Sequence, residues 1–126
     1  MAIYSHLFVG TNDLEKSRQF YDATLAPLGI KRLHDMENSS MYGVDAPEFF
    51  ISRPADGQPA TKANGLTVGF QAPNRAAIDE FHKQAMANGG TDEGAPGPRP
   101  FAPNAYAAYA RCPDGHKLVA VCTKAE

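Results

Sequence analysis

Apolar and polar residues alternate in the first segment of the chain, and a helical pattern follows. Residues 3–10, IYSHLFVG, alternate as a half-buried β-strand does. Residues 13–28 carry apolar side chains at helical spacings of three and four: Leu14, Phe20, Tyr21 and Leu25. Thr11 or Asn12 is the predicted N-cap, with Glu15 three residues after Asn12 as in a capping box. The opening segment is therefore predicted to be a strand followed by a helix.

The same pattern recurs 61 positions further along the chain. Residues 65–73, GLTVGFQAP, form a second alternating run, Asn74 is a second predicted N-cap, and residues 75–90 show a second helical pattern. The same offset aligns two further pairs, Phe20 with Phe81 and Gly29 with Gly90. The chain therefore contains two copies of one structural unit.

Shorter runs after each helix predict about three more strands per copy. These runs are 31–38, 39–46 and 48–54 in the first copy, and 104–112 and 116–123 in the second. The Asp114-Gly115 pair between the last two is a hairpin signal, and the segment 53–64, rich in Pro, Gly and Ala, connects the copies. We predict an α+β fold of two tandem βαβββ modules in one domain, with module 1 at about 1–54, a linker at about 55–64 and module 2 at about 65–126.

Composition and charge exclude several functional classes. The 126 residues are 43% hydrophobic and 21% charged, as in ordinary globular proteins. A formal charge of −2 provides no basic surface for nucleic acid or an anionic membrane, and no apolar run is long enough to span one. Cys112 and Cys122 lack the spacing of a zinc or redox motif and are expected to be reduced thiols packed in strands. We expect a cytoplasmic protein with a small-molecule ligand.

Several motifs together resemble the vicinal oxygen chelate superfamily, which includes glyoxalase, bleomycin-resistance proteins and extradiol dioxygenases. They are HLFV followed by NDLEKSRQFY, the helix end LAPLG, the second opening GLTVGFQAP, the loop GAPGPRP and the ending PDGHKL. The resemblance covers about residues 3–123. It implies that the modules form an open, cup-shaped mixed β-sheet with the helices packed outside. It also implies a ligand in the cup, a divalent metal at its floor in the enzymes, and a homodimer.

The positions that carry metal ligands in the resembling enzymes can be checked in this sequence. His6 matches the first ligand position, but Thr67 and Val119 occupy two others, and Glu48 is the only carboxylate near the fourth. A catalytic metal needs three or four protein ligands, usually imidazole and carboxylate. We therefore expect no cofactor. A divalent metal (zinc, nickel, manganese or iron) held by an atypical set such as His6, Glu48 and His116 is the alternative.

The cup is predicted to bind a small, mostly apolar ligand. By the alternation and the resemblance, the predicted lining residues are His6, Phe8, Thr67, Gln71, Arg99, Tyr106 and Val119. His6 is a metal ligand, a direct ligand contact or a histidine satisfied by a hydrogen bond. No catalytic residue is assigned; if the protein is an enzyme, it is a glyoxalase-like lyase, an isomerase or a dioxygenase.

Residues 89–104 contain four prolines and no recognisable secondary structure, and we expect them to form a stiff loop at the rim of the cup. Arg99 in this loop pairs either with a carboxylate or phosphate of a ligand or with loop carbonyls. Tyr106 is a rim residue or a core residue. His34 and His82 are expected on solvated surfaces, and His116 is expected to be a turn residue.

Overall fold

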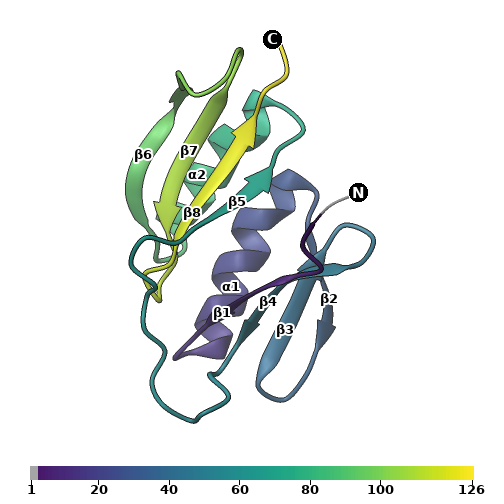
Figure 1. Cartoon of the computed structure of the whole chain (residues 1–126), viewed down its shortest axis with the longest axis vertical. Helices are drawn as coiled ribbons and strands as arrows, with labels where there is room; N and C mark the ends of the chain where they lie inside the picture. The colour runs from purple at the N-terminus through teal and green to yellow at the C-terminus, as the bar shows by residue number, and fades with distance from the viewer. Residues whose placement is uncertain (1–2) are drawn as a thin grey trace.

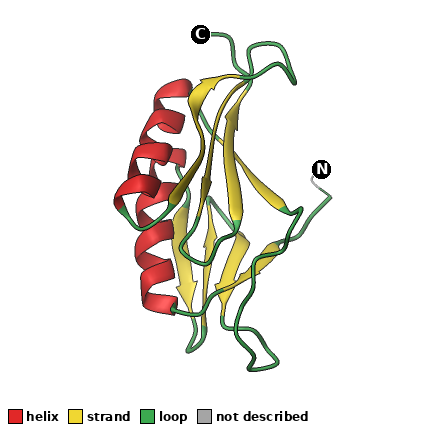
Figure 2. Cartoon of the chain, turned by 90° about the vertical axis from the view of Figure 1, so that its left-hand side faces the viewer, coloured by secondary structure: helices red, strands yellow, loops and turns green. Residues whose placement is uncertain are grey.

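The computed structural model describes residues 3–126 and contains two helices packed on two four-stranded mixed sheets (Figures 1 and 2). Module 1 comprises β1 (Leu7–Gly10), α1 (Leu14–Leu25), a short 3₁₀ helix (Ala26–Leu28), β2 (Lys31–Asp35), β3 (Ser39–Gly43) and β4 (Pro47–Ser52). Module 2 comprises β5 (Thr67–Gln71), α2 (Arg75–Ala87), β6 (Thr91–Pro98), β7 (Tyr106–Arg111) and β8 (Lys117–Cys122). The predicted α+β fold of two tandem βαβββ modules is confirmed.

Both sheets have the same topology. The strand orders are β1-β4-β3-β2 and β5-β8-β7-β6, and in each sheet the first strand pairs in parallel with the last. Figure 2 shows both helices on the same side of the sheets. We call the other side of the two sheets the open face; Phe8, Phe50, Gly69, Tyr109 and Val119 belong to it.

The alternation predicted from the sequence decides which side chains face the helices. Val9 and Val68 are buried in the core, as are Phe20 and Phe81, which occupy equivalent positions of α1 and α2. Leu66, which has the same parity as Val68 but precedes β5, is 42% exposed. The two helices contact each other, so one core runs through both modules.

The first N-cap lies one or two positions beyond the prediction. Asp13 caps α1, and its Oδ1 accepts from the backbone N–H of Lys16 at 3.1 Å. Thr11 instead bonds the backbone of Asp13, and the Asn12 side chain bonds the linker residue Ala60. The predicted cap Asn74 on α2 is confirmed. Asp13 and Asn74 are 61 residues apart, so the repeat offset identifies the cap better than the capping-box pattern does.

Each helical segment ends at a glycine in the left-handed conformation. Gly29 has φ +82° and Gly89 has φ +91°. The glycine equivalent to Gly29 is therefore Gly89, and the predicted alignment with Gly90 was wrong by one residue. Gly90 serves a different need, because a Cβ there would lie 2.7 Å from two backbone carbonyl oxygens.

The predicted loop 89–104 contains a strand, and this expectation was wrong. Residues Thr91–Pro98 form β6, which pairs antiparallel with β7 through a register that shifts twice. β6 is an edge strand, and an edge strand tolerates proline because one of its sides has no ladder partner. Gly and Pro in this run thus hid a strand rather than marking a loop.

A set of hydrogen bonds joins module 1 to module 2 and to the linker. His116 Nε2 lies 2.7 Å from the Gly10 carbonyl oxygen, and the Asn12 backbone N–H donates to Asp114 Oδ1 at 2.9 Å. The Asn12 side chain also makes two bonds with the Ala60 backbone. His116 is buried, so it is more than the turn residue predicted from the sequence. These bonds fix the end of β1 against the start of β8.

Both cysteines are buried free thiols, as expected. Burial raises the pKa of the Cys112 thiol, which keeps it protonated and unreactive. Neither helix within residues 3–126 is long and apolar enough to cross a membrane.

Candidate functional site

The open face of module 1 is built around two stacked rings. Phe50 on β4 lies opposite Phe8 on β1 in the parallel ladder. The His6 ring stacks on Phe50 with centroids 4.4 Å apart and planes 11° from parallel. Because Phe8 is 52% exposed and His6 is also exposed, these aromatic surfaces remain accessible from the open face. The arrangement is a ready surface for stacking or apolar contact with a flat group.

Three hollows meet at these residues. The first, which we call the module 1 hollow, has a volume of about 770 Å³ and extends over the open face of β1, β3 and β4. Its walls include His6, Phe8, Met36, Met41, Phe50 and Arg53. Two methionines and two phenylalanines make this surface adaptable and apolar, while Arg53, just after β4, and Glu37 add one charge of each sign.

The second hollow, the intermodule cleft, lies between β1 and β5 and has a volume of about 580 Å³. Its lining includes His6, Glu48, Phe49, Phe70 and Gln71, with the Phe49 and Phe70 rings meeting edge to face at 5.1 Å across the modules. His6 lines both this cleft and the module 1 hollow. Polar groups in the cleft therefore include an imidazole, a carboxylate and an amide, and the hydroxyls of Tyr4 and Ser5 also line it.

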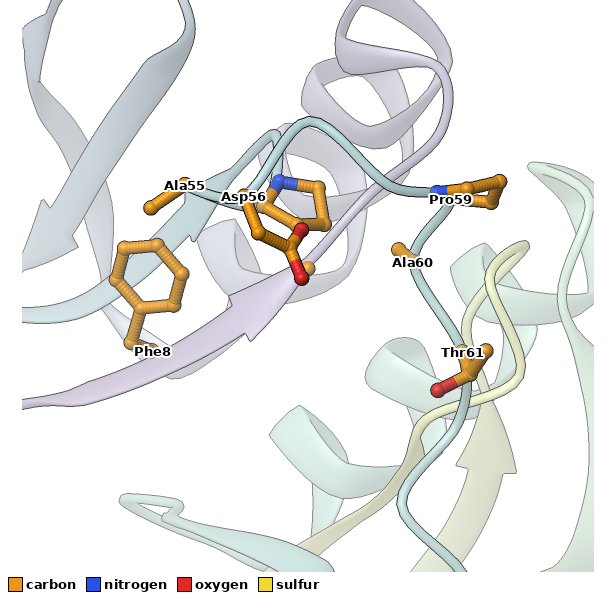
Figure 3. Close-up of a pocket in the computed structure, with 8 residues that line it drawn as sticks. Phe8, Ala55, Asp56, Pro59, Ala60 and Thr61 are labelled. Atoms are coloured by element: carbon orange, nitrogen blue, oxygen red, sulfur yellow. The ribbon is translucent and has the colours of Figure 1, made fainter.

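The third hollow lies under the linker and has a volume of about 490 Å³. Figure 3 shows the Phe8 ring near Ala55 and Asp56 of the linker, with Ala60 and Thr61 further along the same segment. The linker is held here by its bonds to Asn12. Phe8 thus contributes to two hollows, as His6 does.

The remaining predicted cup residues are distributed over the second sheet. Thr67 and Gln71 are exposed on β5, and only Gln71 lines one of the three hollows. Val119 lies on the open face of β8 beside Gly69 and is itself buried. The structure therefore brings His6, Phe8 and Gln71 together around the hollows and leaves Thr67 apart.

Arg99 and Tyr106 do not lie together at the rim of the cup. The Arg99 guanidinium donates to the carbonyls of Ala95 at 2.8 Å and Pro98 at 3.2 Å, the second of the two predicted arrangements. Tyr106 lies on the helix side of β7, where its hydroxyl bonds Asp79 Oδ1 on α2 at 2.5 Å. That bond raises the pKa of Tyr106. Tyr106 therefore packs against α2 and does not line the cup.

The other histidines have different environments from one another. His34 is exposed on β2, as predicted. The expectation for His82 was wrong, since its side chain is only 14% exposed and its Nε2 lies 2.8 Å from Asp92 Oδ1 on β6. That partner lies in the strand that the sequence pattern concealed.

The donor atoms do not fit a three-ligand metal site. Within residues 3–126, no three His, Cys, Asp or Glu side chains lie together as metal ligands would. His6 and Glu48 line one cleft. Thr67, on the neighbouring module, offers only a hydroxyl, and Val119 has an isopropyl side chain without a donor atom. His116, the third member of the alternative set, is buried with its Nε2 on the Gly10 carbonyl.

Two groups of open-face residues were missed at the sequence level. Phe50 and Met41 share the open face with Phe8, and alternation along residues 48–52 would have placed Phe50 there. Alternation likewise places Tyr109 on the open face of β7 once Tyr106 faces the helix. The alternation itself was visible in the sequence. Which of the two alternating sets of residues faces the helices was not.

Fold and site together define a paired-βαβββ protein whose open face carries hollows lined by aromatic residues. The model of the Glyoxalase/Bleomycin resistance protein/Dioxygenase superfamily matches residues 3–119, and the chain belongs to this superfamily. No curated protein matches the sequence.

Solved structures agree with this assignment. A glyoxalase/bleomycin resistance protein from Albidiferax ferrireducens T118 is 44% identical, with a TM-score of 0.86 over 95% of this chain and 98% of that one. A glyoxalase-related enzyme from Fulvimarina pelagi is 16% identical, with a TM-score of 0.75 over 96% and 88%. The fosfomycin resistance protein FosX from Mesorhizobium loti is 14% identical, with a TM-score of 0.69 over 98% and 94%. The last two show the fold alone.

Proposed function

We propose that this protein binds a small, mostly apolar ligand on the open face of module 1, and that binding requires no metal. The observation that carries the proposal is the stack of the exposed His6 ring on the half-buried Phe50 ring, beside the exposed Phe8 where the hollows meet. An exposed aromatic surface of this kind is stabilised when a flat apolar group covers it, because apolar area leaves water and the rings gain dispersion contacts.

A few polar groups supply orientation. His6 offers an imidazole, and Glu48 and Gln71 offer a carboxylate and an amide in the intermodule cleft. Small-molecule sites commonly combine a mainly apolar wall with a small number of placed polar groups. A ligand with one or two hydrogen-bonding groups on an apolar frame matches this lining.

A ligand screen tests the proposal. Thermal-shift measurements against aromatic metabolites, small carbonyl compounds and thiol conjugates should identify a stabilising compound, since a ligand at 100 times its Kd stabilises by about 2.7 kcal/mol. Calorimetry then compares the compound's Kd for the native protein, Phe50→Leu and the control Phe101→Leu, whose ring is exposed beyond β6. We expect Phe50→Leu to weaken binding about tenfold through lost stacking. Equal affinity of the two variants would place the ligand elsewhere.

A second candidate function is that of a divalent-metal-dependent lyase, isomerase or dioxygenase. The observation in its favour is that His6 and Glu48 line the same cleft. Elemental analysis of protein purified without a histidine tag tests it. Stoichiometric metal that is retained in His34→Ala but lost in both His6→Ala and Glu48→Gln would establish this function and refute metal-free binding.

We also propose that the protein is a cytoplasmic homodimer. Exposed apolar side chains at Ile3, Tyr4 and Val44 support a contact with a second copy, since burying them removes apolar area from water. Light scattering should give twice the 13.5 kDa chain mass. A mass equal to one chain at micromolar concentration would refute the dimer.

A further inference from the structure

The chain contains two asparagine–glycine pairs, Asn64–Gly65 in the linker and Asn88–Gly89 at the end of α2, and an alanine precedes each of them. In such a pair the backbone nitrogen of the glycine can attack the side-chain amide of the asparagine, because glycine has no Cβ to block the approach. The attack needs a free asparagine side chain and open space around the glycine. The two pairs differ in both respects.

Asn64 and Gly65 lie in an exposed turn. The Leu66 N–H donates to the Ala63 carbonyl oxygen at 3.1 Å, which makes Asn64 and Gly65 the middle residues of a β-turn. Among the hydrogen bonds of residues 3–126, none involves the Asn64 side chain or the Gly65 N–H. A Cβ at Gly65 would meet no atom within 4 Å beyond its own chain neighbours. The asparagine side chain is therefore free to swing onto the Gly65 nitrogen.

The Asn88–Gly89 pair is held in place. Asn88 Nδ2 donates to the Gln84 carbonyl oxygen at 2.8 Å and to Gln84 Oε1 at 3.3 Å, so the asparagine side chain is bonded back along α2. The surroundings are also more crowded, because a Cβ at Gly89 would lie 3.6 Å from Lys16 Cε and 3.7 Å from Pro113 Cγ. The same three-residue sequence thus occurs once in a free turn and once in a fixed helix end.

We propose that Asn64 is a site of spontaneous modification, where the asparagine is converted to aspartate and isoaspartate while Asn88 is protected. The Gly65 nitrogen forms a bond with Asn64 Cγ, the Cγ–Nδ2 bond breaks, and Nδ2 leaves as ammonia with the proton of the Gly65 N–H. Water then opens the resulting cyclic imide at either of its carbonyls, which gives an aspartyl or an isoaspartyl residue. Each product adds one negative charge to the linker.

The isoaspartyl product also changes the backbone before β5. Its main chain runs through the former side-chain carbon and is longer by one carbon atom, so the bond between the Leu66 N–H and the Ala63 carbonyl cannot keep its geometry. β5 begins at Thr67, directly after this turn, where it pairs with Lys117 of β8. The modification therefore alters the point at which the linker enters the second sheet.

Peptide mapping of aged protein by mass spectrometry tests the proposal. Trypsin cleaves after Lys62 and Lys83, so the two pairs fall in different peptides. At mildly alkaline pH the native protein should convert Asn64 about tenfold or more faster than Asn88, because attack at Asn88 must first break two hydrogen bonds. In urea the two asparagines should convert at similar rates, since they lose their different surroundings. Equal rates in the native protein, or a difference that persists in urea, would overturn the proposal.

Two variants extend the test. Asn64→Gln does not readily form the small imide, so its peptide should stay unmodified under the same conditions, and conversion as fast as in the native protein would refute the mechanism. Asn64→Asp carries the new charge on a backbone of the original length. In ¹H–¹⁵N spectra the aged native protein should show shifts at residues 63–68 that Asn64→Asp lacks, and identical spectra would refute the change before β5. Neither measurement uses a ligand, so the result is independent of the binding proposed for module 1.

Discussion

Replacing His116 by leucine should loosen the junction between the two modules. His116 is 6% exposed, and its Nε2 bonds the Gly10 carbonyl oxygen at 2.7 Å, across 106 residues of sequence. Leucine fills much of the space of the imidazole but has no donor. The substitution therefore removes the hydrogen bond with little change in packing.

The magnitude follows from two opposing effects. Leaving a buried carbonyl without its donor costs about 1–3 kcal/mol. His116 Nδ1 is buried without a hydrogen-bond partner, and removing it returns part of that cost, about 1 kcal/mol. We expect a net loss of about 1 kcal/mol, within a range of about 0–2 kcal/mol, in the free energy of unfolding, and a loss of about 1 kcal/mol lowers Tm by roughly 3–6 °C in a domain of this size.

Urea unfolding followed by circular dichroism measures this loss. His34→Leu is the matched control, because His34 is exposed on β2 and surface substitutions usually change stability by less than about 0.5 kcal/mol. If His116→Leu unfolds at the same urea concentration as His34→Leu, the bond to Gly10 does not stabilise the module junction and the reasoning is refuted.

Two other predictions concern packing and acid stability. Gly90→Ala should destabilise the fold by about 1–3 kcal/mol, because the new Cβ would lie 2.7 Å from two carbonyl oxygens. The control Gly69→Ala, whose Cβ would have its nearest neighbour at 3.5 Å, should leave Tm nearly unchanged. Similar Tm values for the two variants would contradict this prediction. The hydrogen bond with His82 lowers the pKa of Asp92 below its ordinary 3.8, so Asp92 stabilises the fold above that pH and this contribution is lost as the pH falls through the lower, folded-state pKa. Urea midpoints should therefore be lower for Asp92→Asn than for the exposed control Asp45→Asn at pH 6, and the two should converge as the pH falls below 3.8; a gap that persists there would refute the linkage.

Sequence periodicity predicted the elements that repeat. The 61-residue offset and the helical spacing identified both helices and the core pair Phe20 and Phe81, because the burial of one helix face imposes a period of 3.6 on apolar residues. The alternation before each helix likewise predicted β1 and β5, although the strand predicted over residues 3–10 begins at Leu7 and His6 lies just before it. These features depend on the local geometry of a helix or a strand, so their periods can be read directly from the sequence.

The tertiary structure alone decided which distant groups meet. β6 is stabilised by pairing with β7 and not by its own Gly- and Pro-rich composition. This pairing places Asp92 within hydrogen-bond distance of His82, and the glycines of β6 leave room for the Arg99 guanidinium. Which β7 side chains face the helices, with Tyr106 toward α2 and Tyr109 on the open face, depends on packing against α2, where Tyr106 bonds Asp79, 27 residues earlier in the chain. The burial of His116 depends on a carbonyl in the other module. Contacts between residues far apart in the chain leave no period in the sequence, and for that reason the sequence could not show them.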